Sequence, residues 1–293
     1  MAGLNLALQM ADSGKVNVIS NTNLDENNTN YAQGGIASVT TESDSFESHI
    51  NDTLTAGAGL CHKDAVEVMV SEGPDRINDL IDWGVNFSRS KESSDYELAR
   101  EGGHSVSRIF HVKDFTGAEI QRVLLERAKE HPNIQLFEDY YAIDLITDHH
   151  VLGNLQAAFN ICFGAYVFSK NDRKVHVFRS GYTIIATGGG SRVYQYSTNP
   201  ETSTGDGVAM AYRAGVRIAN MEFIQFHPTA LYEPGHRLFL ISEALRGYGG
   251  IIKNLEGEAF VKKYDNRGEL APRDIVSRAI DSEMKKRRED HVW

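Results

Sequence analysis

The chain has 293 residues, of which 30 are Lys or Arg and 40 are Asp or Glu, so its formal net charge is −10. This charge argues against nucleic acid as a partner, because a polyphosphate backbone would be repelled. At about 150 residues per domain the length predicts two domains, and 41% hydrophobic residues with 26 glycines is an ordinary globular composition that argues against disorder and collagen.

The first predicted elements are a helix and a strand. Apolar residues recur at helical spacing between Gly3 and Ser13, and the β-branched segment Val16–Ile19 follows directly. A helix followed by such a strand is typical of chains that pack a helix on a parallel sheet. We therefore expect one half of a strand–helix–strand unit, whose other strand and glycine turn would precede Gly3.

Helices and strands continue to alternate along the chain. The apolar spacing predicts further helices over residues 64–84, 117–130, 205–215 and 271–288. Two strands, 173–179 and 182–186, are predicted within a meander that begins near Leu155. Near Asn220 the alternation gives way to loops rich in Pro, His and Arg, so we place a domain boundary there and expect domains over 1–219 and 220–293.

Neither a membrane segment nor a disulfide is expected. No stretch approaches the roughly 18 to 20 apolar residues that a membrane span requires, and the N-terminus lacks the features of a secretory signal. Cys61 and Cys162 are far apart and outside any metal-binding spacing. We therefore expect a cytoplasmic protein without a structural zinc.

Two glycine-rich segments are candidates for nucleotide binding. The run Gly188–Gly190 follows a predicted strand, and α/β proteins bind nucleotides where strands end. Glycine there lets main-chain N–H groups approach an anionic or flat ligand closely. Gly34 and Gly35 follow Gln33 in a polar loop. Taken alone, each segment could equally be a tight turn.

Charged residues are dense in three later segments. The segment Arg100–Ser105 (REGGHS) places a cation, a carboxylate and an imidazole around two glycines, and could be either catalytic or a salt-bridged loop. His227 alone is more often a core residue than a catalyst. Pro272 stands at the expected first position of a helix, and Arg273 follows it. The Arg273 guanidinium would suit a carboxylate if it faced a cleft. Together, a small dicarboxylate pocket could be formed by His104, His227, Glu101, Glu243, Arg246 and Arg273.

Seven segments occur in the order found in one flavoprotein family. They are Tyr31–Ala37 (YAQGGIA), Arg100–Ser105, Ala186–Gly189 (ATGG), Gly205–Gly207 (GDG), Gln225–Tyr232 (QFHPTALY), Glu243–Gly247 (EALRG) and Gly268–Asp274 (GELAPRD). By these segments the chain resembles the fumarate reductase and succinate dehydrogenase flavoproteins over nearly its whole length, and within that family it resembles the L-aspartate oxidases.

The resemblance implies an α/β fold and bound FAD. The fold would be a Rossmann-like FAD-binding domain followed by the start of an α+β capping domain. The first strand and the GxGxxG loop of the family would precede Gly3, so this FAD-binding domain is incomplete. FAD would be non-covalent, because Asn28 stands where the respiratory members carry the histidine that bonds to the flavin. The implied FAD-binding residues are Asn21, Asn28, Thr29, Gln33, Gly34, Gly35, Gly188, Gly189 and Asp206.

The resemblance also implies a reaction, the oxidation of L-aspartate to iminoaspartate in the first step of NAD biosynthesis. Glu101, His227 and Ser242 would bind the substrate, with Glu101 facing its amino group, which succinate lacks. Arg273 would move the proton, and Glu243 would assist because arginine has a pKa above about 12. Oxygen or fumarate would accept the electrons. Quinolinate synthase would be a partner protein.

Several departures from the family bear on this interpretation. The family has a second histidine, a second substrate arginine, a C-terminal FAD-binding segment and a helical domain that do not occur in these 293 residues, so we expect little or no turnover from them alone. Ser242 replaces a threonine, Tyr248 a glutamate and Asn21 a lysine. Two alternatives stay open: a flavoprotein of the fumarate reductase or succinate dehydrogenase type, and a non-catalytic remnant that binds a nucleotide.

Overall fold

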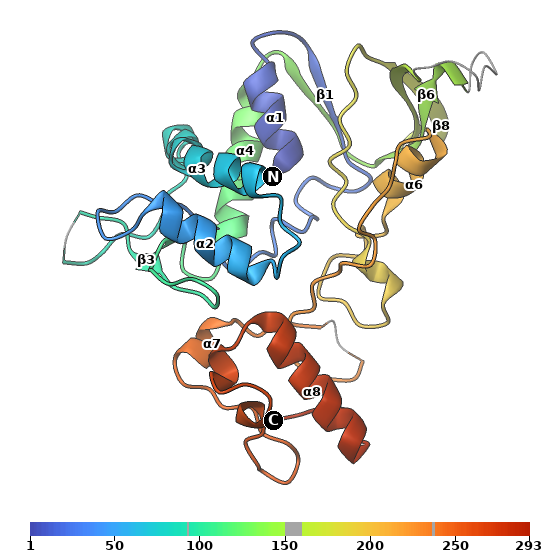
Figure 1. Cartoon of the computed structure of the whole chain (residues 1–293). Coiled ribbons are helices and arrows are strands. Elements are labelled where there is room, and N and C mark those ends of the chain that lie inside the picture. The colour runs from blue at the N-terminus through green and yellow to red at the C-terminus, as the bar shows by residue number, and fades with distance from the viewer. Residues whose placement is uncertain (93, 150–159, 236–237) are drawn as a thin grey trace. The chain divides into compact units, whose positions relative to one another are not determined.

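The computed structural model describes residues 1–92, 94–149, 160–235 and 238–293 (Figure 1). They form two compact units, each made of two stretches of chain. Unit 1 contains Met1–Tyr31 and Ala118–Ile224, and unit 2 contains Ala32–Gly117 and Gln225–Trp293. The two units are described separately. The proposed domains over 1–219 and 220–293 stay a prediction.

Unit 1 contains helices and two small sheets. Its elements are α1 (Ala2–Met10), β1 (Val16–Ile19), all but the first two residues of α4 (Thr116–Glu130), β5 (Ile134–Phe137), β6 (Tyr140–Thr147), β7 (Cys162–Ser169), β8 (Lys174–Arg179), the 3-10 helix η1 (Ser191–Val193) and α6 (Asp206–Arg213). The predicted first helix and strand are confirmed, and β1 pairs in parallel with β5 from Val16 opposite Ile134 to Ile19 opposite Phe137. Helix α1 buries Leu4 and Ala7.

The second sheet is the antiparallel meander β6–β7–β8. Leu145 of β6 and Val167 of β7 form a buried cluster with Met210 and Ala214, so α6 packs on this sheet. Phe178 of β8 packs edge-on against Phe137, with ring centroids 4.9 Å apart. The predicted strand near 173–179 is confirmed as β8, whereas the predicted start of the meander near residue 155 lies outside the described residues.

The predicted strand over 182–186 is wrong. This segment has no strand structure, and no described residue pairs with it. The Tyr182 side chain is 91% exposed and that of Ile184 is 61% exposed. A β-prone sequence forms a strand only where a neighbour accepts and donates its main-chain hydrogen bonds. Apolar and β-branched composition therefore could not decide the structure here.

Unit 2 contains more helix and a sheet of very short strands. Its elements are β2 (Ile36–Ala37), α2 (Phe46–Ala56), α3 (Lys63–Trp83), β3 (Leu98–Ala99), β4 (Ile109–Phe110), α7 (Ala244–Gly247), the 3-10 helices η2 (Val261–Lys263) and η3 (Gly268–Leu270), and α8 (Arg273–Arg287). The strand order is β2–β4–β3, and both pairings are antiparallel. β3 and β4 therefore form a hairpin whose connecting loop carries residues 100–108.

Helix α8 is fixed by a compact core. Val276 and Ala279 pack with Phe260 and Val261, and all four are almost fully buried. The buried carboxylate of Glu283 accepts hydrogen bonds from three neighbours: the Asn254 amide (3.1 Å), the Tyr264 hydroxyl (3.3 Å) and Arg287 Nε (2.6 Å). These contacts hold the helix whose first residue is Arg273.

The long helices agree with their sequence patterns to within two residues, as α3, α4, α6 and α8 show. One detail is wrong: Pro272 is the N-cap of α8 rather than its first residue, because its ψ of 148° is extended and helical geometry starts at Arg273. Within the described ranges no helix is long and apolar enough to cross a membrane. Nor do those ranges contain three or more His, Cys, Asp or Glu side chains arranged to hold a metal ion.

Candidate active site

The centre of the candidate site is an ion pair in unit 2 between Arg273 and Glu243. Arg273 Nε donates to Glu243 Oε2 at 2.6 Å, and Arg273 Nη2 lies 2.6 Å from the same oxygen. The Glu243 side chain is 15% exposed and that of Arg273 is 32% exposed. Arg273 starts α8 and Glu243 directly precedes α7, so two helix ends fix the pair.

Glu101 forms an ion pair with the same guanidinium. Its Oε2 is 3.6 Å from Arg273 Nη2. Burial raises the pKa of the Glu101 carboxyl, and the neighbouring Glu243 raises it further, while Arg273 and His111 oppose this rise. The backbone places this carboxylate by a tight turn in which the His104 N–H donates to the Glu101 carbonyl at 3.2 Å. The turn needs glycine at Gly103, whose φ of +87° is left-handed.

Three further side chains from residues 225–242 belong to this region. Gln225 Oε1 accepts from Arg273 Nη1 at 3.4 Å. His227 Nδ1 lies 2.9 Å from the Thr229 carbonyl oxygen and 3.3 Å from the Thr229 main-chain nitrogen, so the main chain of Thr229 holds the imidazole by this ring nitrogen. Burial lowers the pKa of His227, and the positive charge of Arg273 lowers it further. The half-buried Ser242 precedes Glu243 directly.

Arg246 supplies a second cation to Glu243. Its Nη2 lies 3.1 Å from Glu243 Oε1. The groups are not aligned for a hydrogen bond, and neither Nη2 nor Nε of this buried side chain has a hydrogen-bond partner among the described residues. Nη1 donates to the Glu269 carbonyl at 2.7 Å. Glu243 thus forms ion pairs with two guanidinium groups, those of Arg246 and Arg273.

Acidification should destabilise unit 2. His49, His104 and His227 all have a pKa below the ordinary value of 6.5, because burial and then a nearby arginine disfavour their charged forms. The unfolded chain therefore binds more protons than the folded chain just below pH 6.5, so the free energy of unfolding falls as the pH falls through that window. Glu101, with its raised pKa, opposes this trend but is a single group.

Tryptophan fluorescence can follow this effect, because both tryptophans of the chain, Trp83 and Trp293, lie in unit 2. We expect the urea midpoint to fall between pH 7.5 and pH 5.5. The fall should be smaller in His49→Gln, whereas His176→Gln in unit 1 should match the parent. A midpoint independent of pH in the parent chain would contradict the prediction.

Five of the nine predicted FAD-binding residues come together in three loops of unit 1. Asn28 Nδ2 donates to Ser203 Oγ at 2.9 Å, and a Cβ added to Gly188 would lie 3.1 Å from the same nitrogen. Thr29 Oγ1 accepts from the amino group of Met1 at 2.9 Å. Asp206 starts α6 and accepts from the Tyr141 hydroxyl at 2.8 Å. The fifth residue of this set is Gly189.

Asn21 lies elsewhere in unit 1, just after β1, where its carbonyl oxygen accepts from Lys170 Nζ. The remaining three predicted residues lie in unit 2. Gln33 Nε2 donates to the Leu240 carbonyl at 3.1 Å. A Cβ on Gly34 would lie 3.2 Å from Glu101 Oε1, and one on Gly35 would lie 2.1 Å from the Phe110 carbonyl oxygen. Gly35 therefore packs closely against β4, and any ligand could use only its main chain.

The residues present fit a nucleotide cofactor. Gly188 has a left-handed φ of +74°, and a Cβ on Gly189 would meet no atom within 4 Å, so this turn offers open main chain to a ligand. In unit 2 the buried Gln33 Oε1 has no hydrogen-bond partner among the described residues. A buried amide oxygen without a partner is costly unless a ligand donates to it.

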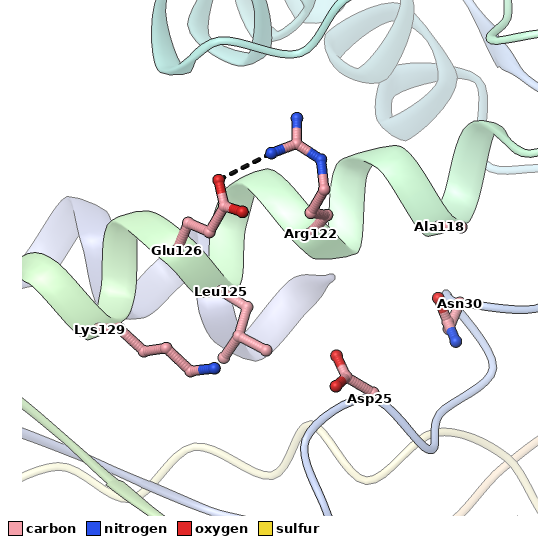
Figure 2. Close-up of a pocket in the computed structure, with 7 residues that line it drawn as sticks. All are labelled: Asp25, Asn30, Ala118, Arg122, Leu125, Glu126 and Lys129. Atoms are coloured by element: carbon pink, nitrogen blue, oxygen red, sulfur yellow. Dashed lines mark hydrogen bonds and ion pairs between the residues drawn. The ribbon is translucent and has the colours of Figure 1, made fainter.

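A separate pocket of about 210 Å³ lies on α4 in unit 1 (Figure 2). Arg122 at its wall is paired with Glu119 and Glu126 on the same helix, so it brings no unpaired charge. None of the predicted site residues lines it. Its lining residues are Asp25, Asn30, Ala118, Arg122, Leu125, Glu126 and Lys129.

Sequence reasoning missed two groups of residues. Gln225 belongs to the motif Gln225–Tyr232 but was not predicted as a site residue. It lies two residues before His227, and in a chain with a period of two residues both side chains would point to the same face. Arg108 with Asp44 and Asp52 gave no signal, because hydrogen-bond partners 64 and 56 residues apart leave no pattern in the sequence.

Comparison with known proteins gives one consistent result. A family model described as "FAD binding domain" matches residues 1–293. The L-aspartate oxidase of Vibrio cholerae is 50% identical over 289 residues, which are 97% of this chain and 53% of that protein. The chloroplastic L-aspartate oxidase 2-a of Nicotiana tabacum is 47% identical over 300 residues, covering 100% of this chain and 46% of that protein. The chain thus spans about half the length of the curated relatives it matches.

Solved structures show the same likeness at the level of the fold. A mutant of E. coli quinol fumarate reductase FrdA superposes with a TM-score of 0.88 and 32% identity over 97% of this chain and 49% of that chain. Mycobacterium smegmatis Sdh1 in complex with UQ1 gives a TM-score of 0.78 with 31% identity over 97% and 48%. The predicted α/β FAD-binding fold is thereby confirmed. The chain belongs to the FAD binding domain family, and FAD is its cofactor.

Proposed function

We propose that this chain is the FAD-binding and substrate-binding part of an enzyme that oxidises L-aspartate to iminoaspartate, with oxygen or fumarate as the electron acceptor. The observation that supports this most is the arrangement of Glu101, Glu243 and Arg273, in which one guanidinium pairs with two carboxylates. The 47 to 51% identity to proteins named L-aspartate oxidase supports the substrate.

Each residue has a defined task in this proposal. Arg273 binds a substrate carboxylate or holds a proton beside the reacting carbon, and Glu243 keeps the guanidinium in one orientation. His227, neutral because its pKa is lowered, donates or accepts one hydrogen bond without adding charge. Ser242 offers a hydroxyl to the same carboxylate. Bound FAD supplies the acceptor for the two electrons that leave L-aspartate.

Glu101 supports L-aspartate over succinate as the substrate. Burial raises the pKa of the Glu101 carboxyl, so a further positive charge beside it favours the ionised form. An ammonium group of the substrate would stabilise that charge, and succinate has no such group. A site built to pair with an ammonium disfavours the analogue without it, because Glu101 then has only the guanidinium that it shares with Glu243.

FAD is held without a covalent bond in this proposal, because the Asn28 side chain is an amide, which is too weak a nucleophile to bond to the flavin, and its nitrogen donates a hydrogen bond to Ser203. We place the protein in the cytoplasm, with quinolinate synthase as the enzyme that takes up its product. We also propose that the 293 residues alone give little or no turnover.

The substrate proposal can be tested in a chimera in which this chain replaces the matching half of the Vibrio cholerae L-aspartate oxidase. Under anaerobic conditions L-aspartate should bleach the flavin absorbance near 450 nm, and succinate should not. A chimera that retains FAD but is reduced by succinate at least as fast as by L-aspartate, or by neither, contradicts the proposal. Loss of FAD from the chimera contradicts the assignment of FAD contacts to this chain.

Replacing Glu101 by glutamine in the chimera should reduce its preference for L-aspartate over succinate by about 10-fold to 100-fold. The amide keeps the shape of the side chain but loses the charge, and a hydrogen bond to a charged group is worth about 1.5–3 kcal/mol. Stopped-flow reduction rates with both substrates give the ratio. Glu97→Gln is the matched control, because it makes the same chemical change at an exposed position four residues away. An unchanged ratio in Glu101→Gln contradicts the role given to Glu101.

The chain itself tests the last part of the proposal. Equilibrium dialysis should detect FAD binding to the 293 residues, while L-aspartate should produce little or no catalytic turnover. Full turnover by these residues would contradict the expectation, and FAD binding without any effect of L-aspartate on the chimera would favour a non-catalytic nucleotide-binding protein.

A further inference from the structure

A buried arginine in unit 2 lies outside the group formed by Glu101, Glu243 and Arg273. Arg108, directly before β4, is 0% exposed. Its Nε and Nη2 donate to the two carboxylate oxygens of Asp44 at 2.8 Å each, and Nη1 donates to Asp52 Oδ2 at 2.6 Å. Nη2 also donates to Ser48 Oγ at 3.0 Å. Asp52 and Ser48 lie in α2 and Asp44 shortly precedes it, so this guanidinium fixes helix α2 to the β3–β4 hairpin.

Asp52 has a second set of partners that Asp44 lacks. The main-chain N–H and the hydroxyl of Ser105 both donate to Asp52 Oδ2 at 2.8 Å. Burial alone would raise the pKa of Asp52, but the hydrogen bonds from Ser105 and Arg108 outweigh it and hold the pKa below its usual range. Asp52 is therefore ionised at neutral pH. Its charge joins α2 directly to the last residue of the segment Arg100–Ser105.

Besides its attachment to Asp52, the segment Arg100–Ser105 is held by two hydrogen bonds of its own. Arg100 Nε donates to the His104 carbonyl at 2.8 Å, and the His104 N–H closes the turn onto the Glu101 carbonyl. The segment is thus a single closed turn. At its start it follows β3, whose residues Leu98 and Ala99 pair with β4. At its end the Asp52 carboxylate receives two hydrogen bonds from Ser105.

We propose that Asp52 is a positioning residue for Glu101: by holding Ser105 it fixes the turn so that the Glu101 carboxylate faces Arg273 and Glu243, and it thereby sets the preference for a substrate with an amino group. Only the effect on substrate preference rests on the proposed function. The positioning itself is a property of unit 2 and does not depend on FAD or on the reaction.

Asp44 provides a matched control. Asp44→Asn and Asp52→Asn each remove one negative charge beside Arg108, but only Asp52 contacts the turn. Asp44 is also the more buried of the two, with a side chain 1% exposed against 19% for Asp52. We therefore expect Asp44→Asn to lower the urea midpoint of unit 2 more, and Asp52→Asn to disturb Glu101 more. A merely structural role for Asp52 would make the two effects run in parallel.

Two measurements on the 293-residue chain test the positioning. Hydrogen exchange should show a loss of protection at the Ser105 amide of about tenfold or more in Asp52→Asn, because its charged acceptor is lost. Carboxyl resonances of ¹³C-labelled glutamate, assigned with Glu101→Gln, report the pKa of Glu101, which is surrounded by Arg273, Glu243 and His111. In Asp52→Asn this pKa should shift down toward its ordinary value, and in Asp44→Asn it should stay at the parent value.

Either of two results overturns the proposal. The first is a Glu101 pKa in Asp52→Asn that equals the parent value while the Ser105 amide has lost protection. The second is an equal shift in both variants. In the chimera, Asp52→Asn should also lower the preference for L-aspartate over succinate about tenfold, with kcat for L-aspartate changed less than KM. If the parent chimera shows no such preference, the proposed function fails, and the exchange and pKa measurements still decide the positioning.

Discussion

Replacement of Arg108 by methionine should lower the free energy of unfolding of unit 2 by about 3–5 kcal/mol, because it leaves the buried Asp44 carboxylate without its cation. The side chain of Asp44 is 1% exposed, so water cannot substitute for the lost guanidinium. The hydrogen bond of Arg108 to Asp44 is also the largest reason that the pKa of Asp44 is lowered. In Arg108→Met this carboxyl should therefore take up a proton at higher pH.

Urea unfolding followed by tryptophan fluorescence gives the measurement for unit 2. Arg267→Met is the control, because Arg267 of unit 2 also donates Nε and Nη2 to the two oxygens of one carboxylate, that of Asp265, but its side chain is 55% exposed. Exposed ion pairs of this kind contribute about 0–1 kcal/mol. Equal losses in the two variants would contradict the importance given to burial at Arg108.

Replacement of Arg273 by lysine should slow the reduction of flavin by L-aspartate in the chimera by about 10²-fold to 10⁴-fold, the usual contribution of a positioned proton donor or acceptor. Arg273 uses Nε and Nη2 together on one oxygen of Glu243 and directs Nη2 toward Glu101 as well. A lysine ammonium is a single point and cannot hold both carboxylates in this geometry.

The control for this variant is Arg278→Lys, one turn further along α8. Its side chain is 73% exposed and pairs with Asp274 on the same helix. Stopped-flow reduction near 450 nm should give parent rates for Arg278→Lys. A chimera with Arg273→Lys that keeps FAD and is reduced at the parent rate would remove Arg273 from the proposed mechanism.

The sequence predicted most of the long helices, although not α2, and it predicted none of the two-residue strands, for a physical reason. Helices such as α3 and α8 have several turns of apolar periodicity, which fixes their position. The strands β2, β3 and β4 have two residues each, so they have no period and exist only because they pair with one another. The segment 182–186 shows the converse, since its composition favours a strand but no described residue pairs with it.

The residues of the candidate site also fall into a group that the sequence predicted and a group that it did not. The family motifs placed Glu101, Glu243 and Arg273 in one pocket, and the structure brings these three side chains together, although their chemical roles stay predictions. The residues that hold the site in place were not predictable. Asp52 and Ser105 lie 53 residues apart in the sequence. They come into contact in the folded chain, where Arg108 joins α2 to the hairpin. A sequence motif identifies the residues that contact a ligand, whereas the residues that hold them in place come together only in the folded chain.

The unpaired segment 182–186 also affects how the protein behaves at high concentration. Tyr182, Ile184 and Ile185 are exposed on a stretch of β-prone backbone that pairs with no strand of the described residues. Such a stretch can take up a strand from another molecule, edge to edge, which is the first step of ordered aggregation. A charged residue at position 184 would act as a gatekeeper against this self-association without touching the catalytic candidates.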